Sequence, residues 1–391
     1  MVDESKYQFM GFTVKVLKML NIWLNDGEID ELKWRSWKTY SIYIFLIPSV
    51  LPLFIELIFI FTEPEADIVI IFQVVLAGVC VAGSMYMTLC FLSNRKGIKE
   101  IIKSIELFTK YSDLDIIAID LKISFYSKIF IFYTITGILI YVIAPTLHVE
   151  TCEATKPRYM KEAGIPCGVI VRIRLPYRYD KSPMFEIYVI HQFLTAAMSS
   201  LVIVNSTILI CGLLRHVELQ FKKLFSYIML ISTVKTSKLS ETVKFCVEYH
   251  HEIIKFVENI NLSFGSQLVV HVTLTSLVIS ILGFEILMED DLFESVRYGM
   301  HLSGWLLLLF TICHFGQNLM DESTSLAIAA YNTPWYNSPV SIQKDILLIL
   351  IRSQKPLTLN AMNLGDLSRA TFLKVLSSAY SYFTLFLNVK K

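Results

Sequence analysis

The chain has 391 residues and a formal net charge of +1. Hydrophobic residues make up 54% of it and charged residues only 18%, a low share of charge for a soluble chain of this size. The net charge gives no support for nucleic-acid binding, and the apolar excess indicates a multi-pass membrane protein.

Six apolar runs are long enough to cross the hydrocarbon core of a bilayer, which takes about 20 residues of helix. The first run is interrupted by Pro48, Pro52 and Glu56, and the other five carry no charge. Proline is tolerated in membrane helices, and we expect Glu56, near the end of its run, to reach the interface by snorkelling. The runs are 40–61, 68–94, 129–149, 187–214, 259–284 and 298–320.

Lysine and arginine are unequally divided between the two sides that these runs define. One set of connecting segments holds 22 of them and the other set holds 8, most of these in 150–186. The positive-inside rule therefore predicts a cytosolic N-terminus. The basic set comprises 1–38, 95–127, 215–258 and 321–365.

The long connection between the fourth and fifth runs is patterned as helix. Val217, Phe221 and Leu224 follow the three-to-four spacing of a packed helix face, and 245–260 repeats that spacing. We expect the two flanking helices to continue into the cytosol and to form an anchor bundle there with a short helix near 341–354.

The count of spans depends on the last segment, because six crossings return the chain to the cytosol. A helix over 366–389 would reach about 36 Å, which is enough to cross. We therefore predict an all-α membrane protein with seven transmembrane helices and an extracellular C-terminus. It divides into 1–320 with the first six helices, a cytosolic loop and anchor helix in 321–365, and the last helix in 366–391.

The last helix has two different faces. Lys374, Ser378, Ser381, Leu385 and Asn388 would share one continuous stripe that is largely polar. The opposite side offers Phe372, Leu376, Phe383 and Leu387 for packing. Such a helix suits a position with water on one side.

Two of the seven cysteines, Cys152 and Cys167, share one predicted outer loop. If that loop is extracellular, a disulfide between them fits the oxidising compartment, and two free thiols are the alternative. No G-x-S-x-G, Walker A, C-x-x-C or H-E-x-x-H pattern occurs, so we expect neither an enzyme with catalytic residues nor a metal or cofactor.

Three runs carry polar and aromatic residues on one helix face. If these faces surround a cavity, it would be mostly apolar with a few hydrogen-bonding groups, as suits a small volatile or lipid-like ligand. From the residues alone, ordinary interhelical packing is the stronger interpretation. The residues are Thr134, Gly137 and Tyr141; Tyr188, Gln192 and Thr195; and Tyr298, His301 and Trp305.

Several segments in the second half of the chain resemble insect odorant receptors. "CHFGQNLMDESTSLAIAAYNTPWYNSP", "ILLILIRSQKPLTLNA" and "TFLKVLSSAYSYFTLF" are similar to the C-terminal signature of that family. "RLPYRYDKSPMFEIYVIHQF" and "VEYHHEIIKFVENINLSF" are similar to the entries to its fourth and fifth helices. The resemblance runs from about Arg172 to Phe386, and upstream only length and span layout agree.

The resemblance implies a non-selective cation channel gated by a small volatile odorant, in the plasma membrane of a sensory neuron and in contact with membrane lipid. In that family an odour-tuned subunit and a shared co-receptor assemble as a heterotetramer. The chain lacks the co-receptor's long intracellular insertion. It also departs from the gustatory receptors, because Ala379 and Asn388 replace a threonine and a glutamine of their final helix. We therefore expect a ligand-tuned subunit.

The resemblance also implies roles for particular residues. The gate falls on Leu385 and Val389 near the outer end of the last helix, the filter on Asn388, and Ser381 lies along the pore. Thr134, Gly137 and Tyr141 match the pocket face of the third helix. The second helix contributes Phe72 and Val75 by a looser match.

Other functions stay open at this stage. A metabotropic seven-helix receptor would need an extracellular N-terminus, which the charge distribution argues against. A gustatory-type channel subunit shares the expected architecture. A transporter or scaffold without ligand gating predicts no odour-evoked conductance.

Overall fold

The computed structural model describes residues 8–23, 41–62, 68–112, 114–147, 149–156, 158–234, 236–289 and 291–389. These residues form helices and one isolated antiparallel bridge, between Asn360 and Asp366, and no strand. Their α-helices are α1 (Gly11–Met19), α2 (Ser41–Thr62), α3 (Ile68–Ser104), α4 (Ile116–Leu147), α5 (Val149–Thr155), α6 (Arg158–Ala163), α7 (Met184–Leu230), α8 (Thr236–Met288), α9 (Leu292–Asn332), α10 (Val340–Ser353) and α11 (Arg369–Val389).

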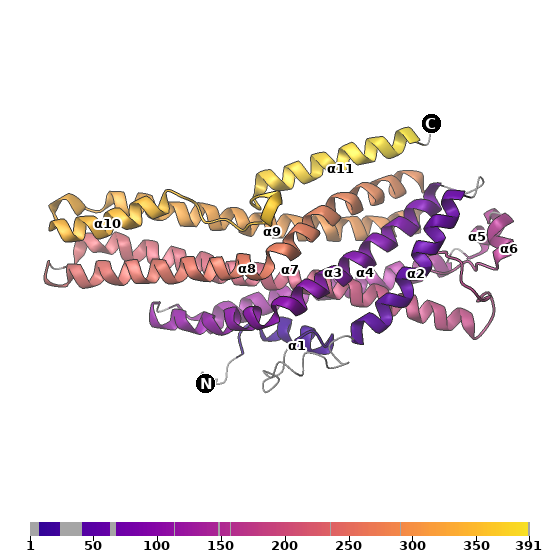
Figure 1. The fold of residues 1–391 in the computed structure, drawn as a ribbon, viewed down its shortest axis with the longest axis horizontal. Coiled ribbons are helices and arrows are strands. Elements are labelled where there is room, and N and C mark those ends of the chain that lie inside the picture. Colours follow the sequence, from indigo (N-terminus) through magenta and orange to yellow (C-terminus); the bar gives the residue numbers. More distant parts are fainter. Residues whose placement is uncertain are drawn as a thin grey trace.

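The long helices run side by side in one elongated bundle (Figure 1). Helices α5 and α6 lie at one end of it, and α10 lies at the other with parts of α7, α8 and α9. The C-terminus ends towards the α5–α6 end. The prediction of an all-α membrane fold is confirmed.

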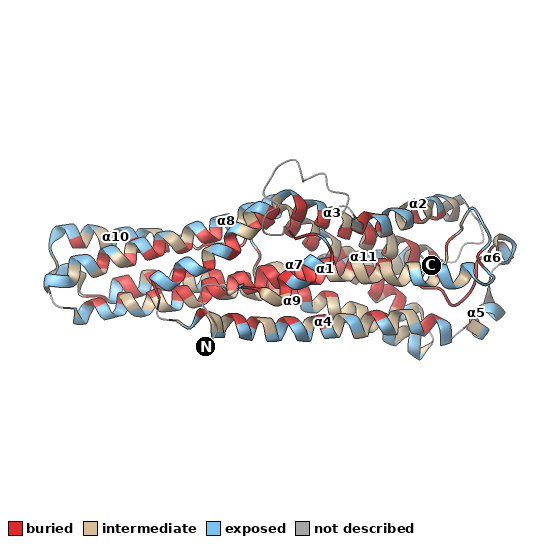
Figure 2. Ribbon diagram, turned by 90° about the horizontal axis from the view of Figure 1, so that it is seen from below, coloured by how far each residue is buried: buried red, intermediate tan, exposed pale blue. Residues whose placement is uncertain are grey.

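Six helices of the described chain, α2, α3, α4, α7, α8 and α9, are long and apolar enough to cross a membrane. Helix α7 lies at the centre of the bundle (Figure 2). In its most apolar stretch of 18 residues 78% of the residues are buried, whereas in the corresponding stretch of α4 only 22% are. On α2 and α4 large apolar side chains such as Leu51, Phe54 and Phe132 face outwards. Exposed apolar stripes of this kind suit contact with lipid.

The helices extend well beyond the apolar runs that reveal them. Helices α7 and α8 continue as predicted, and Val217, Phe221, Leu224, Tyr249 and Ile253 are fully buried between them. Helix α10 forms within one residue of the predicted range. The packed faces of the extensions stabilise them without a bilayer, as the three-to-four spacing predicted. Which side of the membrane they occupy remains a prediction.

The expectation that Glu56 snorkels is wrong. Its side chain is fully buried, and its Oε2 accepts a hydrogen bond of 2.7 Å from the backbone N–H of Arg174. The segment between α6 and α7 folds back over α2 and covers the carboxylate. A local sequence pattern does not reveal this contact, because the two residues are far apart in the chain.

Helix α11 packs along α8 and α9 through one side only. The Oγ of Ser280 donates a 2.9 Å hydrogen bond to the carbonyl of Ala379, which is buried. On the predicted packing side, Phe372, Leu376, Phe383 and Leu387 are all partly buried. The predicted polar stripe, Lys374, Ser378, Ser381, Leu385 and Asn388, is exposed along its whole length. The chain therefore leaves this stripe without a cover of its own among the described residues.

A short N-terminal helix that the sequence did not predict is tied into the bundle by buried polar groups. Asp120 of α4 accepts a 2.9 Å hydrogen bond from the backbone N–H of Met10, and Asn205 of α7 donates one of 3.1 Å to the carbonyl of Thr13. The side chains of Asp120 and Asn205 are fully buried, so α1 packs against both α4 and α7.

Replacing Asp120 with alanine is expected to destabilise the fold by about 1–3 kcal/mol, because the N–H of Met10 loses its partner in a buried site. The loss should appear as a lower Tm of the purified protein in detergent. Asp115→Ala is the matched control, since Asp115 accepts only a local 2.8 Å bond from the N–H of Ala118 at an exposed position. Equal Tm values for the two variants would contradict the anchoring role.

Candidate ligand-binding cavity

One cavity of about 210 Å³ lies inside the half of the bundle that carries α5 and α6. Helices α2, α3, α4, α7 and α9 form its wall, and 170–173 from the segment before α7 contributes to it. Most of the lining is apolar, with Leu53, Leu76, Ile138, Ile203 and Leu308 among the side chains. Such a cavity suits a small, mostly apolar ligand.

Most of the predicted pocket residues meet in this cavity. It is lined by eight of them: Thr134, Gly137, Tyr141, Tyr188, Gln192, Thr195, His301 and Trp305. Tyr298 lies immediately behind the lining, fully buried, and its hydroxyl accepts a 2.8 Å hydrogen bond from Nε2 of Gln73. The polar residues at helical spacing on α4, α7 and α9 therefore do face one space.

The residues chosen on the second run do not line the cavity. The ring of Phe72 packs between Phe284 of α8 and Phe386 of α11, each at a centroid distance of 4.7 Å. Val75 is partly buried in the core. The lining face of α3 is Gln73, Leu76, Ala77, Cys80 and Val81. The lining face is thus rotated by one residue from the expected face. Apolar periodicity does not fix the face in a run whose residues are nearly all apolar.

Gln192 holds the segment that contributes Ile170 and Val171 to the cavity wall. Its Oε1 accepts a 2.9 Å hydrogen bond from the N–H of Ile170, and its Nε2 donates to the carbonyl of Val171 at 2.8 Å and to the hydroxyl of Tyr188 at 3.0 Å. Its hydrogen-bonding groups are therefore occupied by the protein. Thr134 is occupied as well, because its hydroxyl donates to the carbonyl of Phe130.

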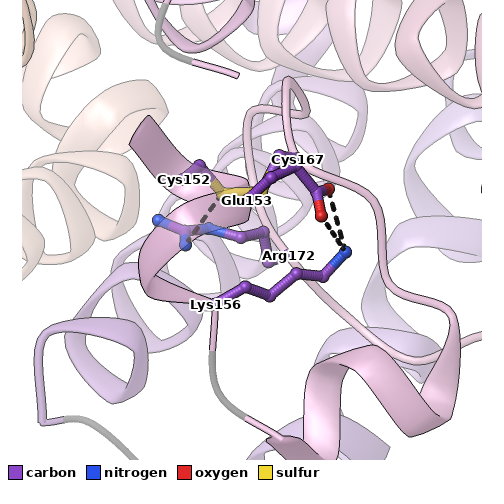
Figure 3. The surroundings of a disulfide bond; sticks show 5 residues. All are labelled: Cys152, Glu153, Lys156, Cys167 and Arg172. Atoms are coloured by element: carbon purple, nitrogen blue, oxygen red, sulfur yellow. Dashed lines mark hydrogen bonds and ion pairs between the residues drawn. A yellow bond between two sulfur atoms is a disulfide. The ribbon is translucent and has the colours of Figure 1, made fainter. Parts of the chain in front are cut away.

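A disulfide between Cys152 and Cys167 joins α5 to the same segment (Figure 3). Nearby, Lys156 pairs with Glu153 at 3.0 Å, and Arg172 points at the sulfur of Cys152. Further along, the hydroxyl of Tyr179 donates to the carbonyl of Ile173, and burial raises the pKa of Tyr179, so this donor keeps its proton. These links fix the position of residues 170–173 over the cavity.

Helix α9 carries a row of interacting polar side chains along the cavity. The indole N–H of Trp305 donates a 3.0 Å hydrogen bond to Nε2 of His301. Arg297, with 3% of its surface exposed, donates from Nη2 to the hydroxyl of Tyr298 at 2.7 Å and pairs with Glu294 at 2.9 Å. Its guanidinium also stacks 4.6 Å from the ring of Tyr141. Arg297 lines the cavity.

Sequence reasoning missed Arg297 and Gln73. Arg297 is the last residue of the acidic segment between the fifth and sixth apolar runs, so the charge count treats it as a loop residue. It nevertheless lies one helical turn before His301 and therefore shares a helix face with it. That spacing is the signal that could have found it. Gln73 is the only polar residue in the first turns of its run, which is also a visible signal.

Comparison with protein families gives one match over most of the chain. A family model described as 7tm Odorant receptor matches residues 67–380. The structure is also similar, with a TM-score of 0.80 and 16% identity over 97% of both chains, to the insect olfactory receptor OR5 from Machilis hrabei in complex with eugenol. That likeness concerns the fold alone.

Curated relatives agree with the family match. Odorant receptor 85b of Drosophila melanogaster is 30% identical over 36% of each chain. Odorant receptor Or2 of Anopheles gambiae is 24% identical over 61% of this chain and 64% of its own length. The odorant receptor coreceptor of Aedes aegypti is 26% identical over 38% of this chain and 31% of its own length. The chain thus spans about a third to two thirds of these relatives.

Proposed function

The chain belongs to the 7tm odorant receptor family, and from that premise we propose that it is the odour-tuned subunit of a ligand-gated, non-selective cation channel. The subunit would act in the plasma membrane of a sensory neuron, together with a shared co-receptor in a heterotetramer. Membership in this family agrees with the expectation that the chain is not an enzyme.

The observation that carries this proposal is the mostly apolar cavity of about 210 Å³ inside the bundle. A volatile molecule entering it would bury its apolar surface, which contributes about 25 cal/mol for each Å² removed from water. The predicted orientation places the cavity in the outer half of the membrane, where a ligand arrives from outside. In this proposal the site binds its ligand without changing it chemically.

The exposed stripe of α11 supports a pore role for this helix. In the proposed assembly the stripes of several subunits face a common axis, with Asn388 as the filter and Leu385 and Val389 as an apolar gate. Such a constriction blocks ions by dewetting. Leu385 is 56% exposed in the single chain, and the side chain of Val389 lies outside the described residues.

A cluster of three aromatic rings joins α3, beside its cavity-lining face, to the end of α11 that carries the proposed gate. Phe72 immediately precedes Gln73, the first lining residue of α3, and its ring contacts Phe386, the neighbour of Leu385 in the sequence. Phe284 of α8 completes the cluster, at 4.7 Å from Phe72 and 6.4 Å from Phe386. A ligand that shifts α3 would therefore displace the end of α11. Gating follows if the ligand binds the open arrangement more tightly.

Recording from cells that express the chain with and without a co-receptor tests this function. We expect volatile ligands to evoke a cation current only when both subunits are present. A tag at the N-terminus should be inaccessible to antibody on intact cells, because a metabotropic receptor would expose it. An accessible tag, or currents abolished by blocking G proteins, would contradict the channel proposal.

A further inference from the structure

Two neighbouring side chains of α9 hold hydrogen-bond donors that no described residue accepts. The Nε of Arg297 is buried and has no partner, although the Nη2 of the same side chain is engaged. The Nδ1 of His301 is buried without a partner as well. Buried donors of this kind cost free energy unless an acceptor is supplied.

The protonation of His301 follows from its other nitrogen. Trp305 can only donate, so the Nε2 that receives its N–H must carry a lone pair. The neutral ring therefore bears its proton on Nδ1. His301 thus offers a donor at the same helix face as the Nε–H of Arg297, one turn away. The ring of Tyr141 packs against both, 5.2 Å from the imidazole and 4.6 Å from the guanidinium.

Several other polar groups around the cavity are bonded within the protein. Gln192 binds the covering segment, Thr134 bonds its own helix, and the hydroxyl of Tyr133 donates to the carbonyl of Met300 at 2.7 Å. The hydroxyls of Ser49 and Thr195 lie 3.1 Å apart and bond each other. The Nε–H of Arg297 and the Nδ1–H of His301 are therefore two buried donors that remain available to orient a ligand.

The charges around Arg297 favour a neutral acceptor. Its guanidinium is paired with Glu294 at 2.9 Å, and the buried Glu285 of α8 also lies within its electrostatic range. A ligand carboxylate would meet these two acidic side chains, whereas a ligand ammonium would meet the guanidinium. A neutral carbonyl oxygen has two lone pairs and no charge, so it can accept from N–H groups of two side chains.

We propose that this cavity selects neutral volatile compounds that carry a carbonyl group, such as ketones, aldehydes and esters. The carbonyl oxygen accepts from the Nε–H of Arg297 and the Nδ1–H of His301, and the hydrocarbon part lies against Leu76, Ile138 and Leu308. This inference rests on the proposed function, since it names the ligand class of the same cavity.

The test compares matched ligand pairs on the chain expressed with its co-receptor. Each pair is an aliphatic ketone or ester and the isostere in which a methylidene group, C=CH₂, replaces C=O. We expect the isostere to need a concentration about 10- to 100-fold higher for half-maximal current, because it lacks hydrogen bonds that include one to a charged donor. Equal potency within the pairs would overturn the inference.

Substitutions test whether His301 and Arg297 cause the preference for carbonyl compounds. His301→Phe keeps a ring and removes the donor, so the potency ratio within each pair should fall towards one. His301→Gln should retain most of it, because its amide can accept from Trp305 and still donate to the ligand. Arg297→Met should also lower the ratio. Thr311→Val is the control on the same helix, since its exposed hydroxyl only bonds the carbonyl of Leu307.

A ratio within one variant does not depend on how much protein reaches the surface. If His301→Phe and Arg297→Met both keep the full ratio, the two donors do not recognise the carbonyl and the inference fails. If the isosteres and carbonyl compounds open the channel equally, only the ligand class is wrong. If neither member of any pair evokes a current, the proposed function fails, and the inference fails with it.

Discussion

Cells that express Leu385→Ala with the co-receptor are expected to pass several times more current without ligand than cells with the unchanged chain. Leu385 lies on the exposed stripe of α11 and is 56% exposed in the single chain. In the proposed pore its side chain narrows the axis. Alanine widens this apolar constriction, and a wider constriction fills with water more readily. The resting current of whole cells, before any ligand is added, measures the effect.

Leu373→Ala is the matched control for this variant. Leu373 belongs to the same helix and is 65% exposed, but it lies off the stripe and three turns away from Leu385. We expect its resting current to equal that of the unchanged chain. Equal leak in both variants, or no leak in Leu385→Ala at normal surface density, would remove Leu385 from the gate.

Gly316→Ala is expected to prevent assembly of a functional receptor. A Cβ at Gly316 of α9 would collide with the carbonyl oxygen of Leu367 and would lie 3.1 Å from its carbonyl carbon. This backbone leads directly into α11, so it has to move or α11 loses its position on α9. Overpacking against side chains typically costs about 1–3 kcal/mol, and a backbone obstacle yields less readily. Surface density and ligand-evoked current measure the loss.

The control is Gly299→Ala on the same helix, where a Cβ would meet nothing within 4 Å. There the substitution removes a helix-weakening glycine, so stability should stay equal or rise by up to about 1 kcal/mol. If Gly316→Ala assembles and conducts as well as Gly299→Ala, the close approach of α9 to the segment before α11 does not hold the last helix in place.

The sequence predicts the helices where one physical signal dominates. Long apolar runs locate the six helices that could cross a membrane, and the three-to-four spacing of Val217, Phe221 and Leu224 predicts that α7 continues past its apolar run. Run length does not show how far α3, α4 and α9 extend, because their ends are amphipathic. Helix α1 is not predicted from the sequence, because its position depends on hydrogen bonds with Asp120 and Asn205, which are far from it in the chain.

The cavity is predictable only in part for a related reason. On α4, α7 and α9 a few polar residues at helical spacing stand out, and they line the cavity together. On α3 nearly every residue is apolar, so its face is ambiguous, and the correct face differs from the expected one by a single position. Arg297 and Glu56 are buried charged residues. Glu56 meets Arg174, and Arg297 meets the ring of Tyr141, only in the folded chain, whereas Tyr298 and Glu294 are neighbours of Arg297 on its own helix.

Recording from excised outside-out patches tests the central claim most directly. Such patches contain the receptor and its co-receptor but have lost the soluble contents of the cell, including diffusible second messengers. If the chain is part of a ligand-gated channel, a volatile carbonyl compound applied to the outer face should evoke a cation current in the patch. The delay should be the same as in whole cells. Current that survives in whole cells but disappears in excised patches would contradict the account, because it would show that the ligand signal reaches a separate channel through the cytosol.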